Sequence, residues 1–190
     1  MFSIKITTNP VAKRSQKWIS NALLELMKEK PYKKITITEI CNKANLVRET
    51  FYRNFSSKDA VVKYCLELKF NEFLDSVMID RNNLDLYDIG IHYFTYWKNE
   101  KEFLKILIDN KLINIILDNF SQRLNLIIDQ LIRKKESLQA RNYIVDMYAG
   151  ATTILLIKWI QNNCKESPEE MARIITEYGP INSKYHECDI

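Results

Sequence analysis

The sequence predicts an all-α protein, and three features lead to that prediction. Glycine and proline are scarce, with 3 and 4 residues in a chain of 190, and no proline lies between Pro31 and Pro168. Proteins rich in strands need frequent turns, which favour these two residue types. Apolar residues form 46% of the chain and recur at the spacing of one helix face. We therefore expect long helices packed around a sizeable core.

The first helix is expected to run from Pro10 to about Lys30, after a short arm at residues 1–8. Asn9 followed by Pro10 is typical of a helix start, with an N-cap and proline at the first helical position. Pro31 ends the helix. Its predicted buried face consists of Val11, Trp18, Ile19, Ala22, Leu23, Leu26 and Met27.

Residues 33–59 predict a helix-turn-helix. Thr36, with Glu39 three residues later, forms a capping box at the start of the first helix of the motif. Asn45 follows that helix, and asparagine tolerates the left-handed conformation that a helix-ending turn needs. The alternative is an ordinary helical hairpin in an α-helical protein.

The second helix of the motif is short and basic. Phe51 and Phe55 are four residues apart, so both are predicted to face the core. The residues predicted to remain outside are Arg48, Glu49, Tyr52 and Arg53. A helix that enters a major groove needs such a polar outer face. Ser56 with Asp59 predicts the cap of the following helix.

Charge is distributed unevenly along the chain. Residues 1–58 contain 12 Lys and Arg against 4 Glu, a net charge of +8, whereas residues 59–190 contain 16 basic against 20 acidic residues, a net charge of −4. A basic N-terminal third on a mildly acidic body indicates a polyanionic partner. The alternative is a solvated basic face with no partner.

The rest of the chain is predicted to form helices separated by short polar breaks. Ser167 and Pro168, followed by Glu170, predict a capped start for the last of them. The expected helices cover about 58–79, 84–99, 103–108, 112–134, 137–163 and 168–178.

The sequence contains no motif typical of a metalloprotein, an enzyme or a membrane protein. The four cysteines are far apart, no Cys/His spacing suits zinc, and there is no recognisable nucleophile, phosphate-loop or paired-carboxylate motif. We expect no metal, no cofactor and no enzymatic activity. The N-terminus lacks an apolar signal core and Lys158 interrupts the apolar run 154–157, so we expect a cytoplasmic protein without a membrane span.

The helix-turn-helix resembles that of the TetR (tetracycline-repressor-like) family of bacterial transcription regulators. The matching residues are Ile35, Thr36, Ile37, Ile40, Ala44, Leu46, Arg48, Thr50, Phe51, Tyr52, Phe55 and Lys58. The similarity is strong over roughly residues 9–65 and weaker beyond. It implies a DNA-binding domain over residues 9–57, with the helix-turn-helix at about 36–55. It also implies a helical effector-binding and dimerisation domain over 58–180, and a tail over 181–190.

The resemblance also implies roles for the residues on the DNA side. The expected phosphate contacts are Thr50, Tyr52, Lys58 and, as a further candidate, Thr38. Arg48 and Glu49 are the expected base readers, because arginine pairs bidentately with guanine and a carboxylate accepts from cytosine. Arg53 can serve in either role.

Three residues depart from the family pattern. Asn45 stands where glycine is usual, Val47 where Ser, Thr or Asn is usual, and Glu49 where a small residue is common. Valine cannot accept a capping hydrogen bond, which costs the helix about 1 kcal/mol. An acid facing DNA either repels phosphate or reads cytosine.

The resemblance implies an effector pocket and a dimer interface in the body of the protein. For the pocket we expect the aromatic residues Tyr93, Phe94, Trp97, Phe103 and Phe120, with an ordinary core as the alternative. For an interface built from the last two long helices we expect Tyr148, Gly150, Ala151, Ile154, Leu155, Trp159, Met171 and Ile175, with a core inside one subunit as the alternative.

The predicted function is that of a ligand-responsive homodimeric repressor. Its expected partners are a palindromic double-stranded DNA operator, an apolar or aromatic small molecule, and a second copy of the chain. The alternative is a coactivator or adaptor that kept the fold, lost strong DNA binding and acts through protein contacts. Val47 and Glu49 are the residues that favour this alternative.

Overall fold

The computed structural model of the protein describes residues 9–78, 85–131 and 138–179, and within these ranges it is entirely helical. The elements in chain order are α1 (Pro10–Glu29), the 3-10 turn η1 (Tyr32–Lys34), α2 (Ile37–Lys43), α3 (Arg48–Asn54), α4 (Lys58–Met78), α5 (Leu86–Asn99), α6 (Lys101–Asp109), α7 (Ile113–Leu131), α8 (Leu138–Gln161) and α9 (Pro168–Glu177). The expected all-α fold is therefore confirmed. The predicted tail at 181–190 lies outside the described residues.

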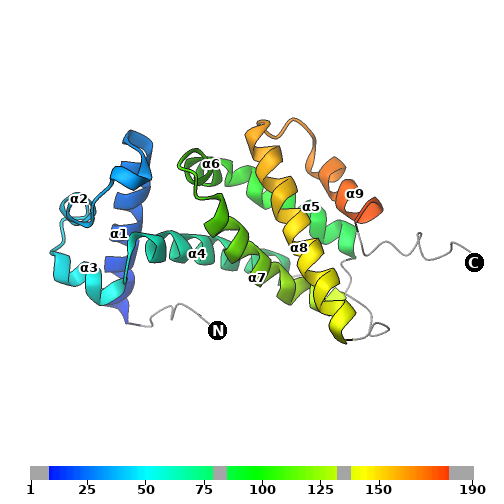
Figure 1. Cartoon of the computed structure of the whole chain (residues 1–190), viewed down its shortest axis with the longest axis horizontal. Helices are drawn as coiled ribbons and strands as arrows, with labels where there is room; N and C mark the ends of the chain where they lie inside the picture. Colours follow the sequence, from blue (N-terminus) through cyan, green and yellow to red (C-terminus); the bar gives the residue numbers. More distant parts are fainter. Residues whose placement is uncertain (1–8, 79–84, 132–137, 180–190) are drawn as a thin grey trace, which may run out of the picture.

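The helices form an N-terminal unit and a body, joined by α4. Figure 1 shows α1, α2 and α3 together at one end of the molecule, and α4 running from them into the body made of α5 to α9. Near its start α4 packs against α1, and further along it packs against α5 and α7. The helix α4 therefore packs against both parts of the molecule.

The first helix starts as predicted, but its buried face differs at two positions. The Asn9 side chain accepts a hydrogen bond from the Val11 backbone N–H at 2.9 Å, and Pro10 follows the cap. Val11 is 63% exposed because it lies one turn before Ser15, the first buried residue of the helix. Trp18 is 44% exposed at the edge of the buried stripe, with the Arg14 guanidinium 5.2 Å from its ring centroid. The prediction that Val11 and Trp18 are buried was therefore wrong.

The long helix α4 begins at the predicted residue, but with a different cap. The Ala60 backbone N–H donates to the Ser57 hydroxyl at 3.2 Å, so Ser57 is the capping residue, and not Ser56. The predicted capping signal was therefore wrong by one residue. The sequence offers two adjacent serines, and only the path of the chain out of α3 selects between them.

The body is built from capped helices that pack closely. Asp85 and Asp88 form a capping box at the start of α5, and Ser167 and Glu170 form the predicted one at α9. Helices α5 and α9 lie close together at Gly90, where an added Cβ would be 3.0 Å from the Cβ of Ala172. A larger residue than glycine at this position would separate the two helices.

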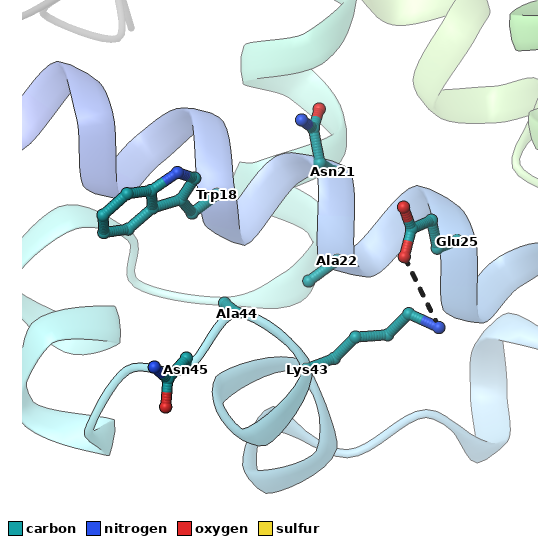
Figure 2. Close-up of a pocket in the computed structure, with 7 residues that line it drawn as sticks. All are labelled: Trp18, Asn21, Ala22, Glu25, Lys43, Ala44 and Asn45. Atoms are coloured by element: carbon teal, nitrogen blue, oxygen red, sulfur yellow. Dashed lines mark ion pairs between the residues drawn. The ribbon is translucent and has the colours of Figure 1, made fainter.

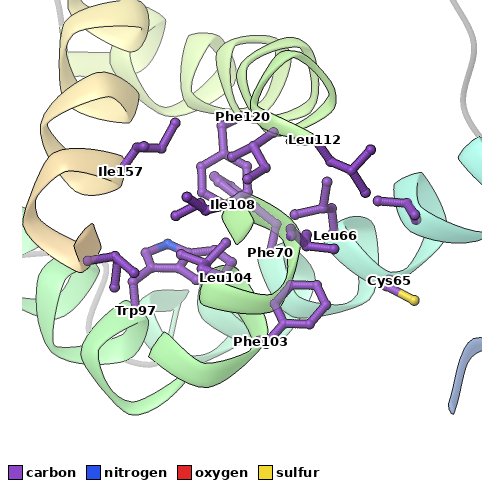
Figure 3. Close-up of a cluster of buried hydrophobic side chains, with 14 of the residues drawn as sticks. Cys65, Leu66, Phe70, Trp97, Phe103, Leu104, Ile108, Leu112, Phe120 and Ile157 are labelled. Atoms are coloured by element: carbon purple, nitrogen blue, oxygen red, sulfur yellow. The ribbon is translucent and has the colours of Figure 1, made fainter. Parts of the chain in front are cut away.

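The core is continuous from the N-terminal unit into the body. Figure 3 shows the part of it inside the body, where side chains from five helices converge. The labelled residues there include Phe70 of α4, Trp97 of α5, Leu104 of α6, Phe120 of α7 and Ile157 of α8, all nearly or completely buried.

One helix in the described part of the chain has the length and composition of a membrane span, over Asn142–Gln161. Half of this segment is buried inside the subunit, as in the core helix of a globular protein. Length and apolar composition alone are weak grounds for a membrane span.

Candidate functional site

The first helix of the predicted motif is fixed at its start by a complete capping box. The Glu39 backbone N–H donates to the Thr36 hydroxyl at 3.2 Å, and the Thr36 backbone N–H donates to the Glu39 carboxylate at 2.9 Å. That carboxylate also pairs with Lys30 at the end of α1. Hydrogen bonds from Lys30 and then Thr36 lower the pKa of Glu39 to about 2. These contacts connect α2 to the exit of α1.

The turn of the motif has the predicted left-handed residue. Asn45 has a φ of 54°, and its backbone N–H donates to the Asn42 carbonyl at 3.1 Å. The next N–H, of Leu46, donates to the Cys41 carbonyl at 2.9 Å and closes the end of α2. Asparagine thus fills the position where the family usually has glycine, as expected from its tolerance of this conformation.

The second helix, α3, is held by its aromatic residues and not by a side-chain cap. Val47 precedes the helix and accepts only through its backbone carbonyl, from the Thr50 N–H at 3.0 Å. Phe51 and Phe55 are 0% and 3% exposed, with ring centroids 6.1 Å apart. Both predictions, the missing cap and the two buried rings, are confirmed.

The outer side of α3 exposes the four predicted residues, Arg48, Glu49, Tyr52 and Arg53. Arg48 donates to the Tyr52 hydroxyl at 3.4 Å, and its guanidinium lies 5.9 Å from the centre of the tyrosine ring. Arg48 and Tyr52 therefore extend together from one side of the helix. Among the other predicted contact residues, Thr38 is exposed and Thr50 is half-buried. Their roles toward DNA stay predictions.

Lys58 has an internal partner that sequence analysis missed. Its ammonium donates to the Tyr32 carbonyl at 2.9 Å and to the Ile35 carbonyl, and it lies 4.5 Å from the Tyr32 ring centroid. Burial lowers the pKa of Lys58. Two of the three ammonium protons are thus used inside the subunit, and one is left for the predicted phosphate contact. The partners lie more than twenty residues earlier in the chain, so local spacing gave no signal.

A second feature missed by sequence analysis joins the N-terminal unit to the body. Asn110, at the end of α6, accepts from the Tyr32 backbone N–H at 2.7 Å and donates to the carbonyls of Met27 at 3.1 Å and Ile106 at 2.9 Å. The Tyr32 hydroxyl in turn donates to Asp59 in the first turn of α4. Tyr32 therefore connects α1, α4 and α6 at one point.

A surface hollow lies between α1 and the turn of the motif. Figure 2 shows Trp18 at one side of it, Asn45 below and the ion pair of Glu25 with Lys43, 3.5 Å apart, at the other. Lys43 also pairs with Glu29 at 2.6 Å. The charges in this hollow thus neutralise one another across the seam between α1 and α2.

The predicted pocket residues lie in the interior of the body. Tyr93, Phe94, Trp97 and Phe120 are 0% to 2% exposed, and Phe103 is 9% exposed at the edge of the same core. The rings of Trp97 and Phe120 are the closest pair, with centroids 4.7 Å apart. In the free protein these side chains form a packed core, the alternative that the sequence left open. A role in binding an effector stays a prediction.

The predicted dimer interface divides into buried and exposed residues. Four of its members are buried inside the subunit and have almost no surface to offer a partner: Tyr148, Trp159, Met171 and Ile175. Their assignment to the interface is corrected, because the amphipathic pattern of a helix cannot distinguish its own subunit from a partner. Of the other four, Ala151 and Ile154 are exposed, and Gly150 and Leu155 are half-buried.

The exposed face of α8 is more apolar than the sequence suggested. Tyr143 is 77%, Met147 54% and Ile154 47% exposed, and they recur at helical spacing on one side with Ala151. Tyr178, after α9, is 73% exposed. Contiguous exposed apolar residues of this kind mark interaction surfaces. Sequence analysis missed Tyr143 and Met147, whose exposure only the packing of α8 reveals.

A short helix with a polar outer face, set by a tight turn after a capped helix and carried by a three-helix unit, defines a helix-turn-helix protein. Comparison with known families agrees with this geometry. Residues 19–65 match the profile described as "Bacterial regulatory proteins, tetR family", and residues 85–179 match the "Transcriptional regulator C-terminal region" of the same family. The chain belongs to the TetR family and is a DNA-binding transcription regulator.

Two solved structures are similar to this chain over most of their length. The "Dihydroxyacetone kinase operon activator DhaS" has a TM-score of 0.53 at 21% identity, covering 85% of this chain and 91% of its own. The "fatty acid degradation regulator FadR from Bacillus halodurans" has a TM-score of 0.58 at 15% identity, covering 89% and 94%. At these identities the likeness shows the fold alone. No curated protein matches the chain.

Proposed function

We propose that the protein is a ligand-responsive homodimeric repressor that reads a palindromic operator with α3. One observation carries this proposal: Arg48, Glu49, Tyr52 and Arg53 are exposed together on α3, while Phe51 beneath them is completely buried. The buried ring fixes the helix, so that its outer side can be presented to a major groove.

Within this proposal the residues divide by role. Arg48 and Glu49 contact base edges, and Arg53 contacts either bases or phosphates. The residues assigned to phosphates are Thr38, Thr50, Tyr52 and Lys58. The contact between Arg48 and Tyr52 supports this division, because it limits the guanidinium to one side of the helix before DNA arrives. Lys58 has the weakest support, since most of its donors are already used.

We infer that the chain works as two units, residues 9–57 for DNA and residues 58–180 for effector and dimer. The apolar stripe of Tyr143, Met147 and Ile154 on α8 supports a second copy as partner, because a monomer would leave it in water. In a two-fold symmetric dimer that reads a palindromic site, we expect the two copies of α3 to lie about 34 to 36 Å apart.

Effector binding would act through α4. Phe70 and Phe73 of α4 contact Trp97 and Tyr93 of α5, with ring centroids 6.4 Å and 5.5 Å apart respectively. A ligand that separates these rings must move α4, and α4 starts directly after the DNA-reading helix. The ligand lowers operator affinity only if it binds the displaced state more tightly than the DNA-bound state.

The test is selection of sheared genomic DNA by the purified protein at about 0.15 M salt, where non-specific binding is weak. We expect an enriched palindrome with the wild type and with Lys105→Ala, an exposed residue of α6 that serves as control. Arg48→Ala should lose base preference at one position of each half-site. A folded dimer that enriches no sequence would contradict the proposal.

A second candidate is a coactivator or adaptor that acts through protein contacts. The uncapped start of α3 at Val47, 65% exposed, and the exposed acid Glu49 on its outer side support it. The similar structure named as an operon activator shows that this fold also occurs in a protein named for activation. Absence of an enriched palindrome in the selection, from a protein that remains dimeric, would favour this candidate.

A further inference from the structure

Two buried hydrogen-bond donors of α5 have no acceptor among the described residues. They are the Tyr93 hydroxyl and the Trp97 indole N–H, in side chains that are 2% and 0% exposed. Buried polar atoms in native proteins are nearly always paired, because an unpaired one loses its hydrogen bonds to water without replacement. Each of these two donors therefore needs an explanation.

Another buried tyrosine and another buried tryptophan of the body have acceptors. The Tyr148 hydroxyl donates to the Ile175 carbonyl at 2.9 Å, and the Trp159 indole N–H donates to the Glu166 carbonyl at 3.2 Å. Tyr148 and Trp159 are as buried as Tyr93 and Trp97. Two other buried atoms of the body, Glu67 Oε2 and Asn119 Oδ1, also lack a partner among the described residues, but both are acceptors. Tyr93 and Trp97 thus carry the buried donors of the described body that have no acceptor.

The rings that carry the two donors lie side by side inside the aromatic core. They are one turn apart on α5, with ring centroids 6.4 Å apart. Figure 3 shows the indole nitrogen of Trp97 turned toward the middle of the cluster, in the direction of Phe120 and Ile157. These neighbours are hydrocarbon and offer no acceptor. A molecule placed among them would meet the indole N–H directly.

The charged groups beside this core neutralise each other. Glu67 of α4 is 6% exposed and pairs with Arg123 of α7 at 2.8 Å, and Arg123 also donates to Asn71 at 2.7 Å. The Arg123 guanidinium lies 6.0 Å from the Phe70 ring centroid, at the border of the aromatic cluster. An anionic ligand would meet an arginine that is already paired and a buried carboxylate oxygen, Glu67 Oε2, that has no donor among the described residues. The site therefore favours a neutral molecule over an anion.

The chemistry of the donors restricts the ligand further. An indole N–H can only donate a hydrogen bond. Burial raises the pKa of Tyr93 well above its usual value, so the hydroxyl keeps its proton at neutral pH. The ligand group that pairs with both must accept, which a carbonyl, ether or hydroxyl oxygen does.

We propose that the effector is a neutral, mainly apolar small molecule whose oxygen accepts hydrogen bonds from Tyr93 and Trp97. This inference rests on the proposed effector response, and it adds the chemical class of the molecule and the two residues that recognise its polar group. In the free protein the two donors have no acceptor within the described residues, and binding supplies one.

The first test compares Tyr93→Phe with Tyr148→Phe in thermal unfolding of the full-length protein. Removing an unpaired buried hydroxyl should raise the unfolding temperature, by about 2 to 4 °C. Removing the Tyr148 hydroxyl, which leaves the Ile175 carbonyl without its donor, should lower it by a similar amount. A lower unfolding temperature for Tyr93→Phe would mean that its hydroxyl has a partner in the free protein, and would overturn the proposal.

The second test uses acetophenone and ethylbenzene, two probes of similar shape that differ in one carbonyl. We expect the wild type and Tyr148→Phe to bind the ketone about tenfold more tightly, the effect of about 1.4 kcal/mol. Tyr93→Phe and Trp97→Phe should each reduce this preference, as measured by titration calorimetry. No preference for the ketone in the wild type, or a preference that survives both substitutions, would overturn the proposal.

Failure of this inference can be distinguished from failure of the proposed function. Tyr93→Phe leaves α3 unchanged, so the variant should enrich the same DNA as the wild type. If the wild type enriches a DNA sequence but does not prefer the ketone, the protein is a regulator whose effector has a different chemistry. Ketone preference without DNA selection would instead leave a ligand-binding protein and contradict the repressor.

Discussion

The start of α2 has its capping partners close by in the chain, whereas two buried donors of α5 have no acceptor among the described residues. Thr36 and Glu39 satisfy each other over three residues. Tyr93 and Trp97, in the body, are packed against aromatic rings, and their donors have no acceptor in the described part of the chain. The N-terminal unit presents its predicted DNA-contacting residues on the exposed side of α3. The body contains buried donors for which we propose a ligand as the acceptor.

The first prediction removes the support beneath the DNA-reading helix and should have the largest effect. Phe51→Ala deletes a completely buried ring that contacts Phe55, which should destabilise the protein by about 3 to 5 kcal/mol. Urea unfolding followed by circular dichroism measures the change. Tyr52→Ala on the exposed side of the same helix is the control, and it should weaken DNA binding with little loss of stability. Equal destabilisation by both would mean that α3 is not held by its buried side.

The second prediction concerns the connection between the two regions. Asn110→Ala removes hydrogen bonds to Tyr32 and Met27, and should destabilise the protein by about 1 to 3 kcal/mol. Hydrogen exchange should then become faster at the Tyr32 amide, which loses its acceptor. The matched control is Asn162→Ala, an exposed asparagine after α8. Unchanged protection at Tyr32 would show that Asn110 does not connect the two regions in solution.

The third prediction separates the two roles of Lys58. If the ammonium mainly holds the carbonyls of Tyr32 and Ile35, Lys58→Met should destabilise the protein by about 1 to 2 kcal/mol and leave the salt dependence of DNA binding unchanged. If it also contacts phosphate, the slope of log K against log salt should fall by about one unit. Binding titrations at several salt concentrations decide between these outcomes, with Arg53→Met as a control on the exposed side of α3.

The smallest expected effect is a dependence of stability on pH through Glu39. Its pKa is lowered to about 2 by Lys30 and Thr36, below the value of about 4.3 in an unfolded chain. The contribution of the Glu39 carboxylate to the stability of the folded protein is therefore fully present above a pH of about 4.3, and it is lost as the pH falls through about 2. The difference in unfolding temperature between the wild type and Glu39→Gln should shrink over this range. A difference independent of pH would mean that the carboxylate charge does not stabilise α2.

The sequence by itself determined the features of the N-terminal unit that depend on residues a few positions apart. The capping box at Thr36, the left-handed Asn45, and the buried Phe51 and Phe55 all follow from local spacing, because backbone geometry places such residues together wherever the helix lies. The family resemblance follows from the same residues.

Only the tertiary structure decided which apolar residues of α8 belong to the core and which are exposed. An apolar pattern predicts that a helix face is buried, but it does not predict whether the same subunit or another molecule covers that face. It also revealed the contacts of Lys58 and Asn110, whose partners are distant in the chain. The tertiary structure was likewise needed to show that the donors of Tyr93 and Trp97 have no acceptor among the described residues. Whether a buried donor finds an acceptor depends on the atoms that packing places beside it, and no local spacing contains that information.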